Sequence, residues 1–253
     1  MLPPYEVFHA IEAGRVVLYY QPLVDLQTRQ IIGYECLSRM IGIDGGIIAP
    51  AQFLPQIEGN YCEWEMLKQH LPVVAQQLER YPDKVFAYNL SATALHFEGL
   101  PELIGQHCQR FGPRLWLEIS ENVSADVFRD CLKGQCGPDF FTLKLLAENH
   151  PLEIDDFGVG SGGFERLVSA PGMFSGVKID RQFVQGCCES PTKAAVLRAI
   201  AEMCSSLSLT IVAEGIEKGA EQEAQFCRDI GIHYGQGWLF GKAEAVPVES
   251  LRG

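Results

Sequence analysis

The chain is short of basic side chains. Its 253 residues carry 20 Lys and Arg against 32 Asp and Glu, which gives a formal net charge of −12. Proteins that grip duplex nucleic acid rely on clustered Lys and Arg to neutralise phosphates, so this balance argues against a duplex-binding protein. The chain also lacks any apolar run close to the roughly 20 residues that span a bilayer, and its first residues do not resemble a secretory leader. We therefore expect no membrane segment and a cytoplasmic location.

Histidine is scarce, and cysteine pairs with metal-ligand spacing are absent. The six histidines are scattered, and no Cys-x-x-Cys pair occurs among the nine cysteines. Both facts disfavour a zinc site. The cysteine count is odd, and Cys187 and Cys188 are adjacent, which suits a reducing compartment better than a disulfide framework.

Short apolar or β-branched runs recur along the whole chain. They lie at residues 16–20, 31–37, 85–90, 115–119, 152–154, 176–179, 209–213 and 231–234. Most are separated by segments with apolar residues three and four apart, one of them interrupted by Pro72 and another following Pro191, which predicts intervening helices. Alternating strands and helices predict parallel pairing. Eight such strands in this length predict one α/β domain over residues 1–253, a (β/α)₈ barrel of the TIM type.

The first two runs are an exception, because only residues 21–30 separate them. That stretch is too short for a helical crossover, so we expect a hairpin that turns near residues 27–29 and leaves one strand antiparallel to the rest. This turn places Gln21 opposite Glu35 or Cys36. Residues 42–49 are expected to form a loop.

Five carboxylates lie within or directly after four of these runs. They are Glu35, Glu118, Asp155, Asp156 and Glu214, and the amides Asn89 and Gln236 occupy equivalent places. Capping of the following helix would explain any single acid. The repetition instead indicates the rim where the strand ends of a parallel barrel meet and where active sites lie.

Acids gathered at one rim repel one another unless cations neutralise them. Oxygen ligands without supporting histidines favour Mg²⁺ or Mn²⁺. The adjacent Asp155 and Asp156 suggest two ions that share a ligand, as in two-metal phosphoester cleavage. Lys178 also lies in an apolar run, and two interpretations are open: a salt bridge with a neighbouring acid, or a cation that orients the attacking water or stabilises phosphorane charge.

A series of motifs resembles the EAL-domain family of cyclic di-GMP phosphodiesterases, in order, from about residue 16 to residue 242. The motifs are YYQPLVDL, GYECLSR, YNLS, LEISE, DDFGVGS, VKIDRQFV, VAEGIE and YGQGWLFGK. The resemblance implies a (β/α)₈-type barrel with one reversed strand. It also implies hydrolysis of cyclic di-GMP to linear pGpG with two Mg²⁺ or Mn²⁺ ions, in a homodimer.

The resemblance further implies roles for individual residues. Ligands of the first metal match Glu35, Asn89, Glu118 and Asp155, and a ligand of the second metal matches Asp156. Lys178 matches the lysine beside the nucleophilic water, and Glu214 and Gln236 match residues that complete the metal and water shell. The catalytic set is therefore Lys178, Glu214, Glu35 and Asp155. Substrate-binding positions match Gln21, Leu37, Arg39 and Asp180, and the Arg39 guanidinium suits a phosphate oxygen. Glu121 matches the glutamate that braces the loop after the two aspartates.

Two departures from the family pattern stand out. Cys36 replaces the alanine between Glu35 and Leu37, and a small buried residue keeps the same packing role. In the loop of residues 159–163, Val159, Ser161 and two glycines replace the usual Thr-Gly-Tyr-Ser/Thr-Ser run, and the glycines should make it more mobile. Two functions thus stay open: an active phosphodiesterase, or a weak or inactive EAL domain that binds cyclic di-GMP or a protein partner as a sensor or regulator.

Overall fold

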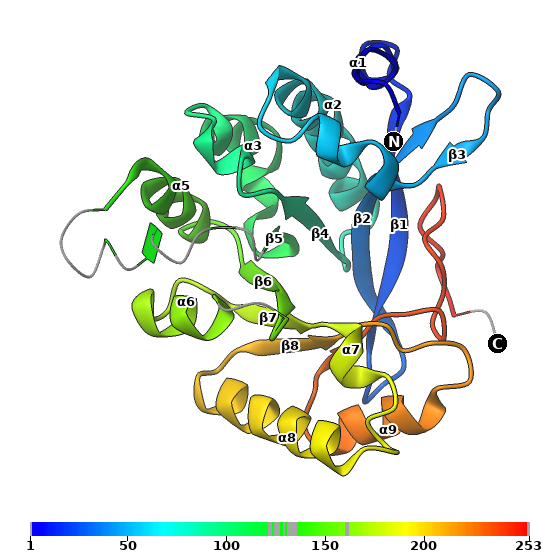
Figure 1. Cartoon of the computed structure of the whole chain (residues 1–253), viewed down its shortest axis with the longest axis vertical. Helices are drawn as coiled ribbons and strands as arrows, with labels where there is room; N and C mark the ends of the chain where they lie inside the picture. Colours follow the sequence, from blue (N-terminus) through cyan, green and yellow to red (C-terminus); the bar gives the residue numbers. More distant parts are fainter. Residues whose placement is uncertain are drawn as a thin grey trace.

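Eight strands close into a barrel in the computed structural model, which describes residues 2–120, 123, 127, 128, 130, 136–159 and 162–251 (Figure 1). The strands are β1 Val16–Asp25, β2 Ile31–Ile41, β4 Val85–Leu90, β5 Leu115–Ile119, β6 Leu152–Phe157, β7 Gly176–Ile179, β8 Thr210–Ala213 and β9 Tyr234–Gly235. They are hydrogen-bonded in this order, and β9 pairs back onto β1. The predicted α/β barrel is confirmed.

Strand β1 is the reversed strand. It pairs antiparallel with β2 and with β9, whereas each of the other neighbouring pairs around the barrel is parallel. The hairpin turn is fixed by Asp25, whose Oδ1 accepts hydrogen bonds from the amides of Gln27 at 2.8 Å and Thr28 at 2.7 Å. The resulting register sets Gln21 opposite Glu35, one of the two partners predicted from the length of the turn.

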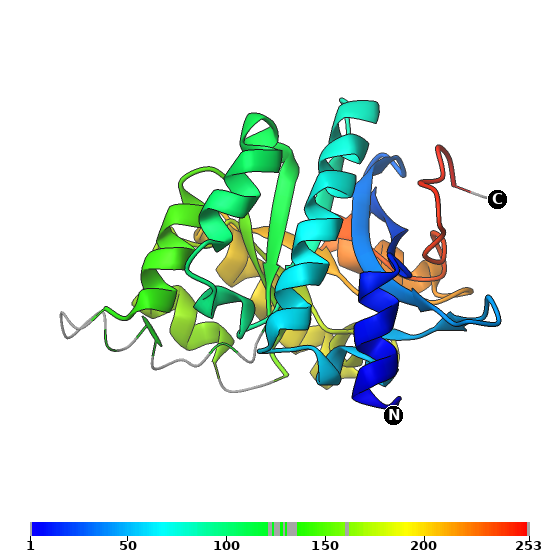
Figure 2. The ribbon, with the colours of Figure 1, turned by 90° about the horizontal axis from the view of Figure 1, so that it is seen from above.

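Helices cover the outside of the barrel. They are α1 Pro4–Glu12, α2 Tyr61–Arg80, α3 Leu100–Cys108, α5 Pro138–Ala147, α6 Gly163–Ser169, α7 Arg181–Val184, α8 Pro191–Ser206 and α9 Glu221–Asp229. Short 3₁₀ helices are η1 Pro50–Gln52, η2 Leu54–Gln56, η3 Ala94–His96 and η4 Gln109–Arg114. Figure 2 shows α2, α3 and α5 standing side by side on one flank. Helix α2 buries Leu67, Leu71, Val74 and Leu78, the spacing of an amphipathic helix, in the main core.

Three local expectations are corrected. Helix α2 continues through Pro72, although proline removes one backbone hydrogen bond and its ring crowds the carbonyl four residues earlier, and the apolar face of the helix stays buried. The expected loop at residues 42–49 contains a short strand, β3 Ile47–Ile48, paired antiparallel with β2. The last strand begins at Tyr234 and not at residue 231, because Gly231, with φ 92°, lies in the turn that ends α9.

Most of the described cysteines carry free thiols. Of the cysteines that the structure describes, seven are free, as expected, but Cys136 is disulfide-bonded, so the expectation of reduced cysteines fails at that position. Among the described residues, no helix combines the length and the apolar character needed to cross a bilayer.

Candidate functional site

The strand ends bring the predicted polar residues together. Glu35 comes from β2, Asn89 from β4, Glu118 from β5, Asp155 and Asp156 from β6, and Lys178 from β7, while Glu214 and Gln236 directly follow β8 and β9. Neighbouring strands hold these residues at matching levels. Asn89, for example, is the register partner of Glu118. We call these eight residues the acidic centre.

Lys178 lies in the middle of the acidic centre. Its Nζ is 2.7 Å from Glu214 Oε1, 3.0 Å from Glu118 Oε2, 3.1 Å from Asp155 Oδ1 and 3.6 Å from Glu35 Oε2. The lysine side chain is only 1% exposed. The salt-bridge interpretation of Lys178 is therefore confirmed, with four carboxylates in place of one.

Two amides orient Glu35. Asn89 donates from Nδ2 to Glu35 Oε1 at 2.8 Å, and Gln236 donates from Nε2 to Glu35 Oε2 at 2.5 Å. Each amide oxygen is thereby left for another partner. Gln236 Oε1 is buried and accepts no hydrogen bond from the part of the chain that the structure describes.

The buried charged groups of the acidic centre shift one another's pKa values. Burial alone would lower the pKa of Lys178, but Asp155, Glu118 and the other two carboxylates hold it well above its ordinary value. Burial raises the pKa of Glu35, yet the charge of Lys178 and the two amide hydrogen bonds outweigh it and hold that pKa below the ordinary value. Burial and repulsion by Glu35 raise the pKa of Glu118. Burial likewise raises the pKa of Glu214, to about 7. One ammonium group thus faces more carboxylates than it can neutralise.

A bulge in β6 explains how two consecutive aspartates reach the same centre. Ile154 pairs with Val177 and Phe157 pairs with Ile179, so Asp155 and Asp156 together oppose the single residue Lys178. In a regular strand successive side chains point to opposite faces. Asp156 instead has φ 52°, in the left-handed region, and such a bulge redirects side chains. Ligand atoms of Asp155, Asp156 and Glu214 consequently lie within 4.8 Å of one another.

The acidic centre has the chemistry of a site for divalent cations. Its donors are carboxylate and amide oxygens, which Mg²⁺ and Mn²⁺ prefer. Glu118 is 0% exposed, and its Oε1 accepts no hydrogen bond from the described residues. A buried carboxylate oxygen without a hydrogen-bond donor is costly unless a cation satisfies it. The residues present therefore fit the predicted cofactor.

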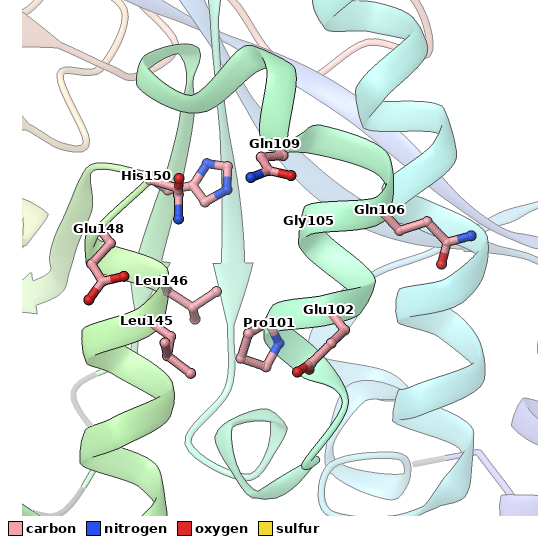
Figure 3. Close-up of a pocket in the computed structure, with 10 residues that line it drawn as sticks. Pro101, Glu102, Gly105, Gln106, Gln109, Leu145, Leu146, Glu148 and His150 are labelled. Atoms are coloured by element: carbon pink, nitrogen blue, oxygen red, sulfur yellow. The ribbon is translucent and has the colours of Figure 1, made fainter.

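A cavity of about 670 Å³ opens beside the acidic centre. Its lining includes Glu35, Leu37, Asn89, Asp155 and Asp156. This volume falls within the roughly 300–1,000 Å³ of ordinary ligand pockets. We call it the rim cavity. A different cavity, of about 380 Å³, lies between α3 and α5 and is lined by residues such as Glu102 and His150 (Figure 3). It contains no residue of the acidic centre.

The predicted substrate-binding residues do not all line the rim cavity. Leu37 lines the rim cavity. Gln21 lines a smaller neighbouring cavity with Glu214 and Gln236, and donates to the Gly241 carbonyl at 3.3 Å. Arg39 is half-buried, and its guanidinium lies 5.9 Å from the Tyr19 ring centroid. Asp180 caps α7, because its Oδ1 accepts a hydrogen bond from the Gln182 amide at 2.8 Å. A contact between Asp180 and substrate stays a prediction.

Some predicted features lie outside the described residues. Glu121, the expected loop brace, is one of them, and so are Gly160 and Ser161 of the 159–163 loop. At the edges of that loop, Val159 is exposed and Gly162 directly precedes α6.

Sequence reasoning missed two buried acids. Glu153 is 2% exposed, is the register partner of Glu118, and has a pKa raised to about 8 by burial. Gly176 leaves room for it, because a Cβ there would lie 2.8 Å from Glu153 Oε1. Its position between Leu152 and Ile154 was the available signal, the same one that marked the other acids. Glu63, on α2, is also buried, but nothing in its local sequence distinguished it from a surface acid.

An eight-stranded α/β barrel with oxygen ligands at its strand ends defines the class: barrel proteins with a candidate centre for divalent cations. A family model for the EAL domain matches residues 6–243. The chain belongs to the EAL-domain family, which includes cyclic di-GMP phosphodiesterases.

Individual relatives agree with this assignment. The probable cyclic di-GMP phosphodiesterase PdeB of Escherichia coli is 29% identical over 248 residues, covering 95% of this chain and 45% of that protein. The bifunctional diguanylate cyclase/cyclic di-GMP phosphodiesterase MucR of Pseudomonas aeruginosa is 31% identical over 258 residues, covering 98% and 35%. The chain thus spans less than half the length of these two curated relatives. The solved PaMucR phosphodiesterase in complex with c-di-GMP superposes with a TM-score of 0.78 at 30% identity, covering 95% of this chain and 96% of that one.

Proposed function

We propose that this chain hydrolyses cyclic di-GMP to linear pGpG at the acidic centre, with two Mg²⁺ or Mn²⁺ ions. One observation carries the proposal: Lys178 and four carboxylates from separate strand ends form a single connected cluster beside the rim cavity. The cluster keeps every residue that the family resemblance assigns to metals and water. The c-di-GMP complex of the PaMucR phosphodiesterase supports the choice of substrate.

The residues of the acidic centre would have different roles in the reaction. Glu35, Asn89, Glu118 and Asp155 would hold the first ion, and Asp156 would hold the second, with Glu214 and Gln236 completing the shell. When bound, the two ions would polarise the phosphoryl oxygens and supply a nucleophilic water near neutral pH. Glu35 is held in place by the Asn89 and Gln236 amides, so it needs little reorganisation.

Lys178 supplies the only cation of the centre itself. Its pKa is held well above the ordinary value, so the ammonium stays protonated and can donate to the attacking water or to the charge that develops on phosphorus oxygens. Arg39, with Gln21, Leu37 and Asp180, would bind the dinucleotide, with the Arg39 guanidinium against a phosphate.

A second candidate function rests on the loop of residues 159–163. Because its composition departs from the family pattern, the chain could bind cyclic di-GMP or a protein partner without efficient hydrolysis. Binding and turnover must therefore be measured separately.

The test is a turnover assay with a metal titration. Purified protein is incubated with cyclic di-GMP and Mg²⁺ or Mn²⁺, and pGpG is quantified by chromatography. We expect pGpG with either metal and none with EDTA. Calorimetry that shows binding while no pGpG forms would establish the second function instead. Absence of both would exclude hydrolysis and binding of cyclic di-GMP, and would leave only the binding of a protein partner.

We also propose that residues 1–253 form one domain that acts as a homodimer. Exposed apolar side chains on α5 and α6 support a contact between two copies; they are Phe141, Leu145, Phe164 and Val168. Sedimentation equilibrium of the wild type and of Val168→Glu tests this, with a shift toward monomer expected for the variant.

A further inference from the structure

A buried carboxylate on α2 joins two loops that flank the rim cavity. Glu63 is 4% exposed. Its Oε2 accepts hydrogen bonds from the Gly59 amide at 2.8 Å and from Thr93 Oγ1 at 2.9 Å, and its Oε1 accepts a hydrogen bond from Ser91 Oγ. The three donors are neutral. They come from the turn before α2 and from the loop between β4 and η3.

The identity of the side chain matches this arrangement. A carboxylate only accepts hydrogen bonds and can serve three donors at once, whereas an amide offers one acceptor oxygen. Ser91 Oγ in turn accepts the Ala94 amide at 3.0 Å, so the hydroxyl that donates to Glu63 also fixes the start of η3. One carboxylate therefore sets the path of the chain just beyond the end of β4.

That path begins at a member of the acidic centre. Asn89 lies two residues before Ser91, and it donates to Glu35 at 2.8 Å. Leu90 is the last residue of β4 that the sheet holds, through its pairing with Ile119. Beyond it, Glu63 anchors Ser91 and Thr93, and these three residues line the same cavity as Glu35 and Asn89.

We infer that Glu63 is a positioning residue, which holds the β4–η3 loop so that the Asn89 amide oxygen is presented to the cation site. The inference rests on the metal site of the proposed function. Removing a residue that orients a metal ligand typically lowers metal affinity or activity by roughly 10–100-fold. Because Glu63 acts through two intervening residues, we expect the lower end, about tenfold.

The experiment measures Mn²⁺ binding to metal-free protein by calorimetry, with no nucleotide present. Glu63→Ala should raise the Mn²⁺ dissociation constant about tenfold relative to the wild type. Glu63→Gln keeps one acceptor oxygen and an N–H that can donate to a hydroxyl. Its Mn²⁺ dissociation constant should therefore lie between those of the wild type and of Glu63→Ala. Glu65→Ala is the matched control on the same helix, because Glu65 pairs at the surface with Lys68 and should bind Mn²⁺ like the wild type.

A purely structural role gives a different result. Glu63→Ala would then unfold at a lower temperature, yet the folded protein would bind Mn²⁺ as tightly as the wild type, and this outcome overturns the inference. If Glu63→Ala does not fold, Thr93→Ala replaces it, because it removes one donor only. A dissociation constant for Thr93→Ala equal to that of the wild type would overturn the inference in that case.

Failure of the proposed function gives a separate signature. A wild type that binds Mn²⁺ but forms no pGpG rejects the phosphodiesterase while leaving the Glu63 comparison valid. If the wild type is active, Glu63→Ala should lower kcat when the substrate is saturating and Mn²⁺ is subsaturating. The kcat of the variant should then recover as the Mn²⁺ concentration is raised. An equal kcat at all Mn²⁺ concentrations contradicts the positioning role.

Discussion

Lys178 Nζ lies 2.7 Å from Glu214 Oε1; Lys178 is in β7, and Glu214 directly follows the adjacent strand β8. The ammonium of Lys178 also contacts Glu118, which is fully buried. Lys178 is thus a structural counter-ion as well as a candidate catalytic group.

Replacing Lys178 with Met should destabilise the metal-free protein. Loss of the ammonium leaves buried carboxylates without a counter-ion, which typically costs about 3–5 kcal/mol. Urea unfolding in EDTA measures the free energy of unfolding, and added Mn²⁺ should stabilise the variant more than the wild type. Lys193→Met is the control, because Lys193 lies at the surface, where it donates to the Gln185 carbonyl. Equal stability of Lys178→Met and the wild type in EDTA would contradict this prediction.

Glu35→Ala should abolish turnover without unfolding the barrel. Two amides and Lys178 converge on this carboxylate, and the family resemblance makes it a metal ligand. We expect kcat for pGpG formation to fall by more than about a hundredfold, beyond the range seen for residues that only support ligands. Circular dichroism checks the fold, and Glu221→Ala, at the start of α9, is the surface control. Substantial residual activity would show that the ligand assignment is wrong.

Stability should fall at acidic pH because of His70. Its Nε2 lies 3.0 Å from the Val16 carbonyl and its Nδ1 lies 3.1 Å from the Tyr88 hydroxyl, and burial lowers its pKa from 6.5 to about 4. Between these values the unfolded chain binds the proton and the folded protein does not. Stability from this group is therefore full above pH 6.5 and is lost as the pH falls toward 4, by about 3 kcal/mol.

The His70 contribution can be separated from that of other titrating groups. Urea unfolding of the wild type and of His70→Gln at pH 7 and pH 4 gives two differences in unfolding free energy. The difference in unfolding free energy between the wild type and His70→Gln should be smaller by about 3 kcal/mol at pH 4 than at pH 7. An advantage that is the same at both pH values would refute the assignment.

Gly237→Ala should damage both the fold and the metal site. Gly237 has φ 149°, and a Cβ there would lie 2.2 Å from the Ile216 carbonyl oxygen, directly beside Gln236. We expect a loss of more than about 3 kcal/mol in unfolding free energy. Gly219→Ala is the matched control, since Gly219 also has positive φ, at 90°, but faces open space. It should cost only about 1 kcal/mol, and equal costs would show that the collision is relieved.

The sequence predicted most of the barrel because its strands are short and apolar and most of them are separated by amphipathic segments. It also predicted the register of the hairpin to within one residue, with Gln21 opposite Glu35 or Cys36, since a turn near Gln27 leaves few alternatives. Carboxylates inside apolar runs identified the acidic centre, because burial of an isolated charge is costly wherever the chain places it.

Other features depend on tertiary structure and leave little local trace. The left-handed backbone of Asp156 follows from the register shift against β7, which single-sequence patterns do not reveal. The contacts of Lys178 with four carboxylates require strands distant in sequence. Glu63 looks like a surface acid of α2 until the β4–η3 loop is placed against it.

The antiparallel strand β1 has a consequence for the order of folding. Its first edge pairs with β2 nearby in sequence, but its second edge pairs with β9, and the Tyr20 amide donates to the Glu244 carbonyl at 2.8 Å. During synthesis the N-terminal hairpin therefore keeps an unpaired strand edge until nearly all the rest of the chain has emerged. Such edges attract other strands, and closure through distant contacts is slow. The barrel is sealed by its last strand, and the free edge of β1 can pair with other strands until then.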